Sequence, residues 1–338
     1  MASVAPAQGP PPAAAPCDAA TACAGTMSGG WCVDTFLAGD RAFPQFSGVW
    51  SNAPDDVWAV GAHAGGGAVK GGGGGFAYHW DGCAWSPAAL PGAAASTPGL
   101  NDVWGAGARD VWIVGARGAA FHWNGSQWSS AATGASGTLD HVSGTGGADV
   151  WALGSAGLFH WNGHAWAVDA RFPLKKSGEL AGDVWAAAPG DVWVAGGLNA
   201  RGSLAHFDGG RWTMPRPSPD LAFGLFGIWS NGAATWAVGE GNQVVRKTDG
   251  GRDGSSEGRW AQLAPPAGSS RGWVNVMGSG DEVWAAGQAV GRSTGGGVLR
   301  PVAGAPAGFY PGLWLNRTQV WVAGITNAGA AVVLHRAR

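Results

Sequence analysis

The chain has 338 residues, a formal net charge of −2 and only 12% charged residues, but 62 glycines and 22 tryptophans. This charge gives no general attraction to nucleic acid, and the sequence contains neither a polybasic run nor an apolar stretch of about 18 residues that could enter a membrane. Abundant glycine for tight turns and abundant tryptophan for packing predict a soluble, all-β protein.

Residues 1–28 are predicted to form a disordered tail rich in proline and alanine. The tail lacks the basic and apolar regions of an intact signal peptide, so we expect the native signal to be missing from this sequence. The four cysteines, Cys17, Cys23, Cys32 and Cys83, predict two disulfides of open connectivity and therefore a secreted, periplasmic or cell-surface protein. A metal site is the weaker alternative, because there is no Cys-x-x-Cys pair and no nearby histidine at ligand spacing.

The segment DVWAVG at 56–61 is one copy of a motif that occurs seven times. Its tryptophans are Trp58, Trp112, Trp151, Trp193, Trp236, Trp284 and Trp321. Their spacing is close to the roughly 40–45 residues of a four-stranded propeller blade. A strand is predicted before each motif. After each motif a third strand leads through an Asp-Gly or Asn-Gly hairpin to a fourth, as in FHWNGSQW at 121–128.

The last unit lacks its fourth strand, because the chain ends soon after the third. Residues 29–36, GGWCVDTF, have the pattern of a fourth strand and place Trp31 where other units have Trp85 or Trp128. A strand from the N-terminus is therefore predicted to complete the last blade and remove an open sheet edge. The predicted fold is a seven-bladed β-propeller over residues 29–338.

The combination of D-V-W-A-V-G with H-W-[DN]-G-x-x-W resembles the Trp-rich propeller repeats of secreted bacterial proteins. The [DN]-G-x-x-W turn is similar to a reduced Asp-box of sialidase-like propellers. The resemblance covers residues 29–338 and implies a fold. It also implies a range of functions that includes glycosidases, lectins, adhesins and assembly factors. A sialidase is disfavoured because only Tyr78 and Tyr310 are present and the arginine segment of that family is absent.

Residues that recur in every unit are interpreted as structural. The motif aspartates, such as Asp110 and Asp149, are expected to bond within turns, and the strand histidines, such as His122 and His160, to be packed. Nearly all the tryptophans are explained as packing between blades.

Function is sought where the units differ. The first strand of each unit has a marker position seven or eight residues before the motif tryptophan, occupied in turn by Trp50, Trp104, Ser143, Trp185, Trp229, Met277 and Trp314. Two residues before this marker, three successive units carry Asp102, His141 and Asp183, and a later unit carries Asn275. Two residues earlier in each unit, the largest side chains found among the seven units are those of Trp273 and Tyr310. Since the first strand of a blade lines the axis, we predict a small axial ligand pocket with an aromatic platform, and Arg271 beside it. The alternative is that these are ordinary strand and turn residues.

The predicted function is a secreted, monomeric, non-enzymatic propeller, lectin-like or adhesive, that binds a carbohydrate or an envelope protein through one basic face. The alternative is an enzyme acting on a glycan or small molecule at the axial mouth, and a purely structural module comes third. No cofactor, nucleic acid or membrane insertion is expected, while a metal bound in the axial channel stays open.

Overall fold

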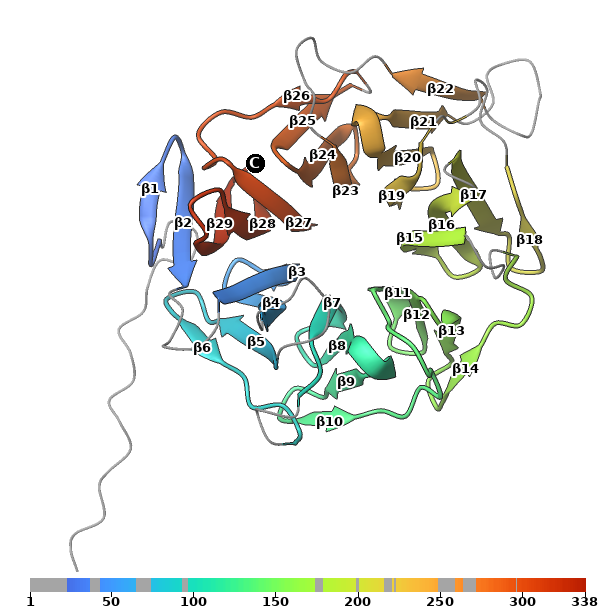
Figure 1. Ribbon diagram of the computed structural model, residues 1–338, viewed down its shortest axis with the longest axis horizontal. Coiled ribbons are helices and arrows are strands. Elements are labelled where there is room, and N and C mark those ends of the chain that lie inside the picture. Colours follow the sequence, from blue (N-terminus) through green and yellow to red (C-terminus); the bar gives the residue numbers. More distant parts are fainter. Residues whose placement is uncertain are drawn as a thin grey trace, which may run out of the picture.

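The computed structural model describes residues 23–36, 43–64, 74–92, 97–173, 179–198, 201–215, 221, 223–248, 259–263, 272–295 and 297–338. Its strands form seven antiparallel sheets arranged around a central axis, with almost no helix (Figure 1). This is the predicted seven-bladed β-propeller. Within the described residues, no helix is long and apolar enough to cross a membrane.

Each blade runs from an innermost strand to a short outermost one. Blades 1 to 3 consist of β3 (Phe43–Ala53), β4 (Asp56–Ala64), β5 (Gly75–Trp80), β6 (Trp85–Pro87); β7 (Leu100–Gly107), β8 (Asp110–Gly115), β9 (Ala120–Trp123), β10 (Trp128–Ser130); and β11 (His141–Gly146), β12 (Asp149–Gly154), β13 (Gly157–Trp161), β14 (Trp166–Val168). Blades 4 to 6 consist of β15 (Glu179–Ala188), β16 (Asp191–Leu198), β17 (Arg201–Phe207), β18 (Trp212–Thr213); β19 (Leu225–Ser230), β20 (Ala234–Gly239), β21 (Val244–Thr248), β22 (Arg259–Leu263); and β23 (Trp273–Ser279), β24 (Glu282–Gly287), β25 (Val290–Thr294), β26 (Arg300–Pro301). Short 3-10 turns, η2 (Ala116–Gly118) and η3 (Glu240–Asn242), follow the second strands of blades 2 and 5.

Blade 7 is closed by the N-terminal segment. It contains β27 (Gly308–Leu315), β28 (Gln319–Thr326), β29 (Ala331–Ala337), β2 (Trp31–Phe36) and β1 (Thr26–Ser28). Strand β2 pairs antiparallel with β29, in a register that runs from Cys32 opposite His335 to Phe36 opposite Ala331. Strand β1 then pairs with β2 as a fifth strand. The tail predicted for residues 1–28 is therefore wrong at its C-terminal end, because residues 26–28 are held in a hairpin.

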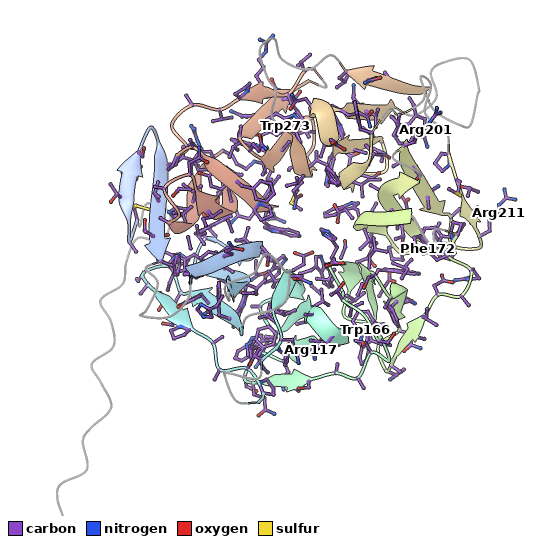
Figure 2. The ribbon with its side chains drawn as sticks, in the orientation of Figure 1. Arg117, Trp166, Phe172, Arg201, Arg211 and Trp273 are labelled. Atoms are coloured by element: carbon purple, nitrogen blue, oxygen red, sulfur yellow. A yellow bond between two sulfur atoms is a disulfide. The ribbon has the colours of Figure 1, made fainter. Side chains whose placement is uncertain are left out.

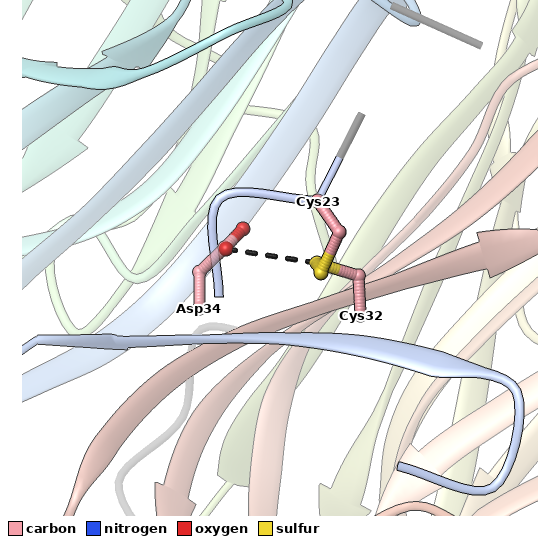
Figure 3. A group of neighbouring side chains, drawn as sticks. All are labelled: Cys23, Cys32 and Asp34. Atoms are coloured by element: carbon pink, nitrogen blue, oxygen red, sulfur yellow. Dashed lines mark hydrogen bonds between the residues drawn. A yellow bond between two sulfur atoms is a disulfide. The ribbon is translucent and has the colours of Figure 1, made fainter. Parts of the chain in front are cut away.

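A disulfide fixes this hairpin. Cys23 is bonded to Cys32, and Asp34 lies beside the bridge (Figure 3). The three side chains are close enough to hold an ion, but the disulfide removes both thiolates that a metal would need. Cys83 is disulfide-bonded as well, and Cys17 lies outside the described residues. An oxidised pair at the ring closure agrees with the predicted use of the cysteines.

Tryptophans fill the spaces between neighbouring blades. Trp58 of blade 1 meets Trp128 of blade 2 edge to face, with ring centroids 5.0 Å apart, and Trp112 of blade 2 meets Trp166 of blade 3 at 5.2 Å. Such pairs add specific geometry to the burial of large apolar surfaces. The repeated tryptophans thus have the packing role predicted for them.

Candidate functional site

A β-bulge decides which side chains reach the axis. In β7, Leu100 pairs with Gly115 and Asp102 pairs with Val114, so one residue between them is left out of register. Since the two partners are consecutive, they point to opposite sides of the blade, and so do Leu100 and Asp102. Leu100 is buried in the core, whereas Asp102 lines the axial cavity. We call the end of the propeller where the innermost strands begin the entry face.

The axial cavity is small and has a polar wall. Asp102, His141, Asp183 and Asn275 all line it, as the sequence predicted, and its volume is about 40 Å³. That volume holds a few water-sized groups, because one water needs roughly 10–15 Å³ by this measure. It is far below the roughly 300 Å³ at which pockets for drug-sized ligands begin.

Tryptophan rings restrict the channel beyond this polar wall. Trp185 of blade 4 and Trp314 of blade 7 belong to opposite sides of the ring, yet their ring centroids are 6.5 Å apart. Trp314 also lies 6.2 Å from Trp50 and donates a hydrogen bond from Nε1 to the carbonyl of Ser51. The sequence analysis did not predict that these rings would narrow the channel. The recurrence of tryptophan at one position of the innermost strands is the sequence feature that could have indicated it.

Asp102 and Asp183 join neighbouring blades. The Asp102 carboxylate accepts hydrogen bonds from its own following amide, Val103 N, and from Val142 N of blade 3, both at 2.9 Å. Asp183 does the same with Val184 N at 2.8 Å and with Ile228 N of blade 5 at 3.0 Å. Burial raises the pKa of Asp102 to about 7. Burial, together with the charge of Asp102, raises the pKa of Asp183 well above its usual value.

His141 stands between the two carboxylates. Its Nδ1 lies 3.4 Å from Asp183 Oδ1 and 3.9 Å from Asp102 Oδ2. Asn275, from blade 6, donates a hydrogen bond from Nδ2 to the carbonyl of Pro311 in blade 7 at 3.1 Å. The four polar residues therefore share one cavity while also tying adjacent blades together.

The predicted aromatic platform is wrong. Trp273 and Tyr310 are each only 1% exposed and pack within one core cluster. The reason is again a bulge, because Trp273 pairs with Gly287 while Asn275 pairs with the adjacent Ala286, which sends these two side chains to opposite sides. Burial raises the pKa of Tyr310 to about 12, and its hydroxyl donates to the carbonyl of Pro306.

The predicted basic face is only partly visible. Arg271 lies outside the described residues. Arg292 belongs to β25, where its Nε lies 2.7 Å from Glu282 Oε1 and its guanidinium covers Trp284. The positive charge of the Arg292 guanidinium is therefore already paired with a carboxylate and an aromatic ring of the same blade.

The repeated histidines and aspartates form structural trios. His122, His160 and His206 each stack on the motif tryptophan of their own blade, with centroids 4.0–4.4 Å apart. In each case Nε2 lies 2.7–2.9 Å from the motif aspartate, and His79 in blade 1 pairs in the same way. This is the structural role predicted for the histidines, although the aspartates bond across to the third strand as well as serving the turn.

Blade 7 breaks this pattern at the same register. His335 still packs on Trp321, with ring centroids 4.2 Å apart and the ring planes tilted by 41°, but Gln319 replaces the aspartate. Gln319 Oε1 and His335 Nδ1 are buried without hydrogen-bond partners among the described residues. Burial lowers the pKa of His335 to about 4. A depressed histidine pKa means that the unfolded chain binds the extra proton, so stability is lost as the pH falls from about 6.5 toward 4.

We therefore expect Gln319→Asp to restore the trio. A carboxylate within reach of the imidazole favours its charged form, so the pKa of His335 should rise by at least one unit and the acid-unfolding midpoint should move to lower pH. The measurement is an NMR titration of the histidine ring protons, with His160, which already has Asp149, as the internal control. An unchanged His335 titration would contradict this account of the lowered pKa.

Comparison with known proteins places the chain among propellers by shape alone. No protein-family model and no curated protein sequence matches it. Similar solved structures include YCF48 from Cyanidioschyzon merolae, at 17% identity and TM-score 0.64, with 90% of this chain and 98% of that chain covered. A structure of YCF48 bound to D1 peptide is similar at 16% identity and TM-score 0.63, with coverages of 90% and 94%. The extracellular domain of BT4673 from B. thetaiotaomicron matches at 11% identity and TM-score 0.64, over 89% of this chain and 39% of that one. At these identities the likeness shows the fold, a seven-bladed propeller with Trp-rich strands.

Proposed function

We propose that this protein is a secreted, non-enzymatic binding propeller whose entry face recognises a polypeptide of the cell envelope. One observation carries the proposal: two carboxylates and an imidazole, from three successive blades, line a cavity of about 40 Å³ at the axis. A cavity of this size and charge suits the tip of one basic side chain, such as a lysine ammonium group.

The size of the cavity also bears on the kind of partner. A sugar ring is larger than a space for a few water-sized groups, so we favour a protein segment over the carbohydrate suggested by the sequence. The similar propeller solved with a bound peptide supports this choice. A disulfide at the ring closure and the likeness to an extracellular domain support an oxidising compartment.

Enzymatic use of the same residues has one observation in its favour, the raised pKa values of Asp102 and Asp183. Perturbed carboxyl groups often occur at catalytic sites, but structural networks perturb them too. Here each carboxylate accepts hydrogen bonds from two strand amides. These bonds compensate for the cost of burying the carboxylate within the structure. We therefore assign these groups to binding and to holding the blades.

Selection from a random peptide library tests the proposal. We expect peptides enriched on the wild-type protein to share a lysine or arginine at one position, and Asp183→Asn to weaken their binding at least tenfold. Binding should strengthen as the pH rises from about 5.5 to 8, because Asp102, whose pKa is about 7, must lose its proton to pair with a cation.

Thermal melts should show that Asp183→Asn remains folded, and a glycan array should be probed in parallel. Enrichment without a fixed basic residue would contradict the cation pocket. Specific glycan binding that survives Asp183→Asn would contradict the choice of a polypeptide partner.

A further inference from the structure

A groove on the rim between blades 2 and 3 lies away from the axial site. It has a volume of about 320 Å³ and is lined by residues of the blade 2–3 connection and of the outer half of blade 3: Thr133, Gly134, Ser136, Ala156, Phe159, Trp166, Ala167 and Val168. Val168 is 52% exposed, while Phe159 and Trp166 are 5% and 7% exposed. The groove thus combines aromatic walls with an accessible rim.

Two other junctions between blades show which side chain occupies the space that corresponds to this groove. At the junction of blades 7 and 1, Phe36 follows the outermost-strand Trp31 by five residues, and its ring lies 5.0 Å from Tyr78 and 5.7 Å from Trp85. At the junction of blades 1 and 2, the residue at this position is Leu90, which packs against the core. Between blades 2 and 3 the position belongs to Thr133, whose hydroxyl donates to the carbonyl of Gly118.

The walls of the groove correspond to the partners of Phe36. Tyr78 pairs with Ala59 as Phe159 pairs with Ala152, and Trp85 pairs with Trp80 as Trp166 pairs with Trp161. The chain therefore builds the same aromatic walls, but in the described connection between blades 2 and 3 the equivalent position carries Thr133 in place of a large apolar side chain. At the junction of blades 3 and 4, the connection again inserts an aromatic ring, because Phe172 lies 5.1 Å from Trp212. Phe172 and Trp166 are both labelled in Figure 2.

A hydrogen bond from the outermost-strand tryptophan is also absent here among the described residues, as it is at the junction of blades 1 and 2. The indole N–H groups of Trp85 and Trp212 donate to Asp34 and Asp169, at 3.0 and 3.1 Å. Ala131 occupies the position of Asp169, because the Ala131 amide donates to the Ala120 carbonyl as the Asp169 amide donates to that of Leu158. The Nε1 of Trp166 is buried without a partner among the described residues, and so is the Nε1 of Trp128, whose junction has Ala88 at this position. The junctions of blades 1 and 2 and of blades 2 and 3 thus share the missing hydrogen bond, and only the junction of blades 2 and 3 also has a threonine where the large apolar side chain would lie.

We propose that this groove is a docking site for an aromatic side chain of a partner polypeptide, held as Phe36 is held within this chain. An extended polypeptide fits better than a free small molecule, because β14 is the outermost strand of its described sheet, and an extended segment can add to such a sheet edge beside the groove. Blade 7 already shows such an addition, where β1 pairs with the outer edge of β2.

The test uses a probe copied from the chain itself, the blocked tetrapeptide acetyl-Val-Asp-Thr-Phe-amide, which reproduces residues 33–36. NMR chemical shifts of the Trp166 indole should change saturably with this peptide and not with acetyl-Val-Asp-Thr-Ala-amide. Val168→Glu at the groove rim should weaken binding at least tenfold. Thr133→Leu, which supplies the side chain found at position 90, should fill the groove and also prevent binding.

Met214→Glu is the matched control. Met214 is 43% exposed and follows Trp212 as Val168 follows Trp166, but its junction already contains Phe172. This variant should bind the probe like the wild type, as should Asp183→Asn at the axis. Absence of saturable binding, equal binding of the alanine peptide, or binding that survives Val168→Glu would each overturn the proposal.

Discussion

Trp31→Ala should lower the free energy of unfolding by about 3–5 kcal/mol, the range for removing a large ring from a packed core. Trp31 is 0% exposed, and its ring meets Trp284 of blade 6 edge to face at 6.2 Å. It also donates a hydrogen bond to the carbonyl of Ala303 and lies under the Arg336 guanidinium. The substitution therefore loosens both β2 and its junction with blade 6.

Chemical denaturation monitored by fluorescence and circular dichroism measures this loss. Trp123→Ala is the control, because Trp123 is only partly buried near the rim, and a loss of about 1–2 kcal/mol is expected there. Deleting residues 1–37 should be more severe still, since it exposes the whole outer edge of β29. If the deletion leaves the melting temperature unchanged, β2 does not close the ring in solution.

Trp273→Ala should be about as destabilising as Trp193→Ala, again on the order of 3–5 kcal/mol. The two rings are 1% and 3% exposed. Trp273 occupies the space above Gly291, where an added Cβ would lie 2.6 Å from the indole. This expectation replaces the interpretation drawn from the sequence, in which Trp273 was part of an aromatic platform for a ligand.

A double-mutant cycle sharpens the second prediction. Gly291→Ala should destabilise the wild-type protein but be tolerated in Trp273→Ala, because the second substitution removes the ring that the methyl group would meet. Affinity for peptides selected on the wild type should persist in the folded fraction of Trp273→Ala. A small stability loss combined with lost binding would instead return Trp273 to the binding site.

The sequence determined the architecture of this protein, because its periodic features are local. The DVW motif and the Asn-Gly and Asp-Gly turns each specify a strand or hairpin within a few residues. The missing fourth strand of the last unit and the matching pattern at 29–36 identified the closure, which the pairing of β2 with β29 confirms. Spacing along an innermost strand likewise placed Asp102, His141 and Asp183 at the axis.

Tertiary structure decided what sequence spacing could not. A bulge of one residue reverses the side of the blade that a residue faces, so Trp273 entered the core while Asn275 reached the axis. The size of the cavity depended on Trp185 and Trp314 meeting from opposite blades. The groove beside Trp166 exists because Thr133 stands where another junction has Phe36. Each of these outcomes rests on contacts between residues far apart in the chain, and no pattern within a single repeat specifies them.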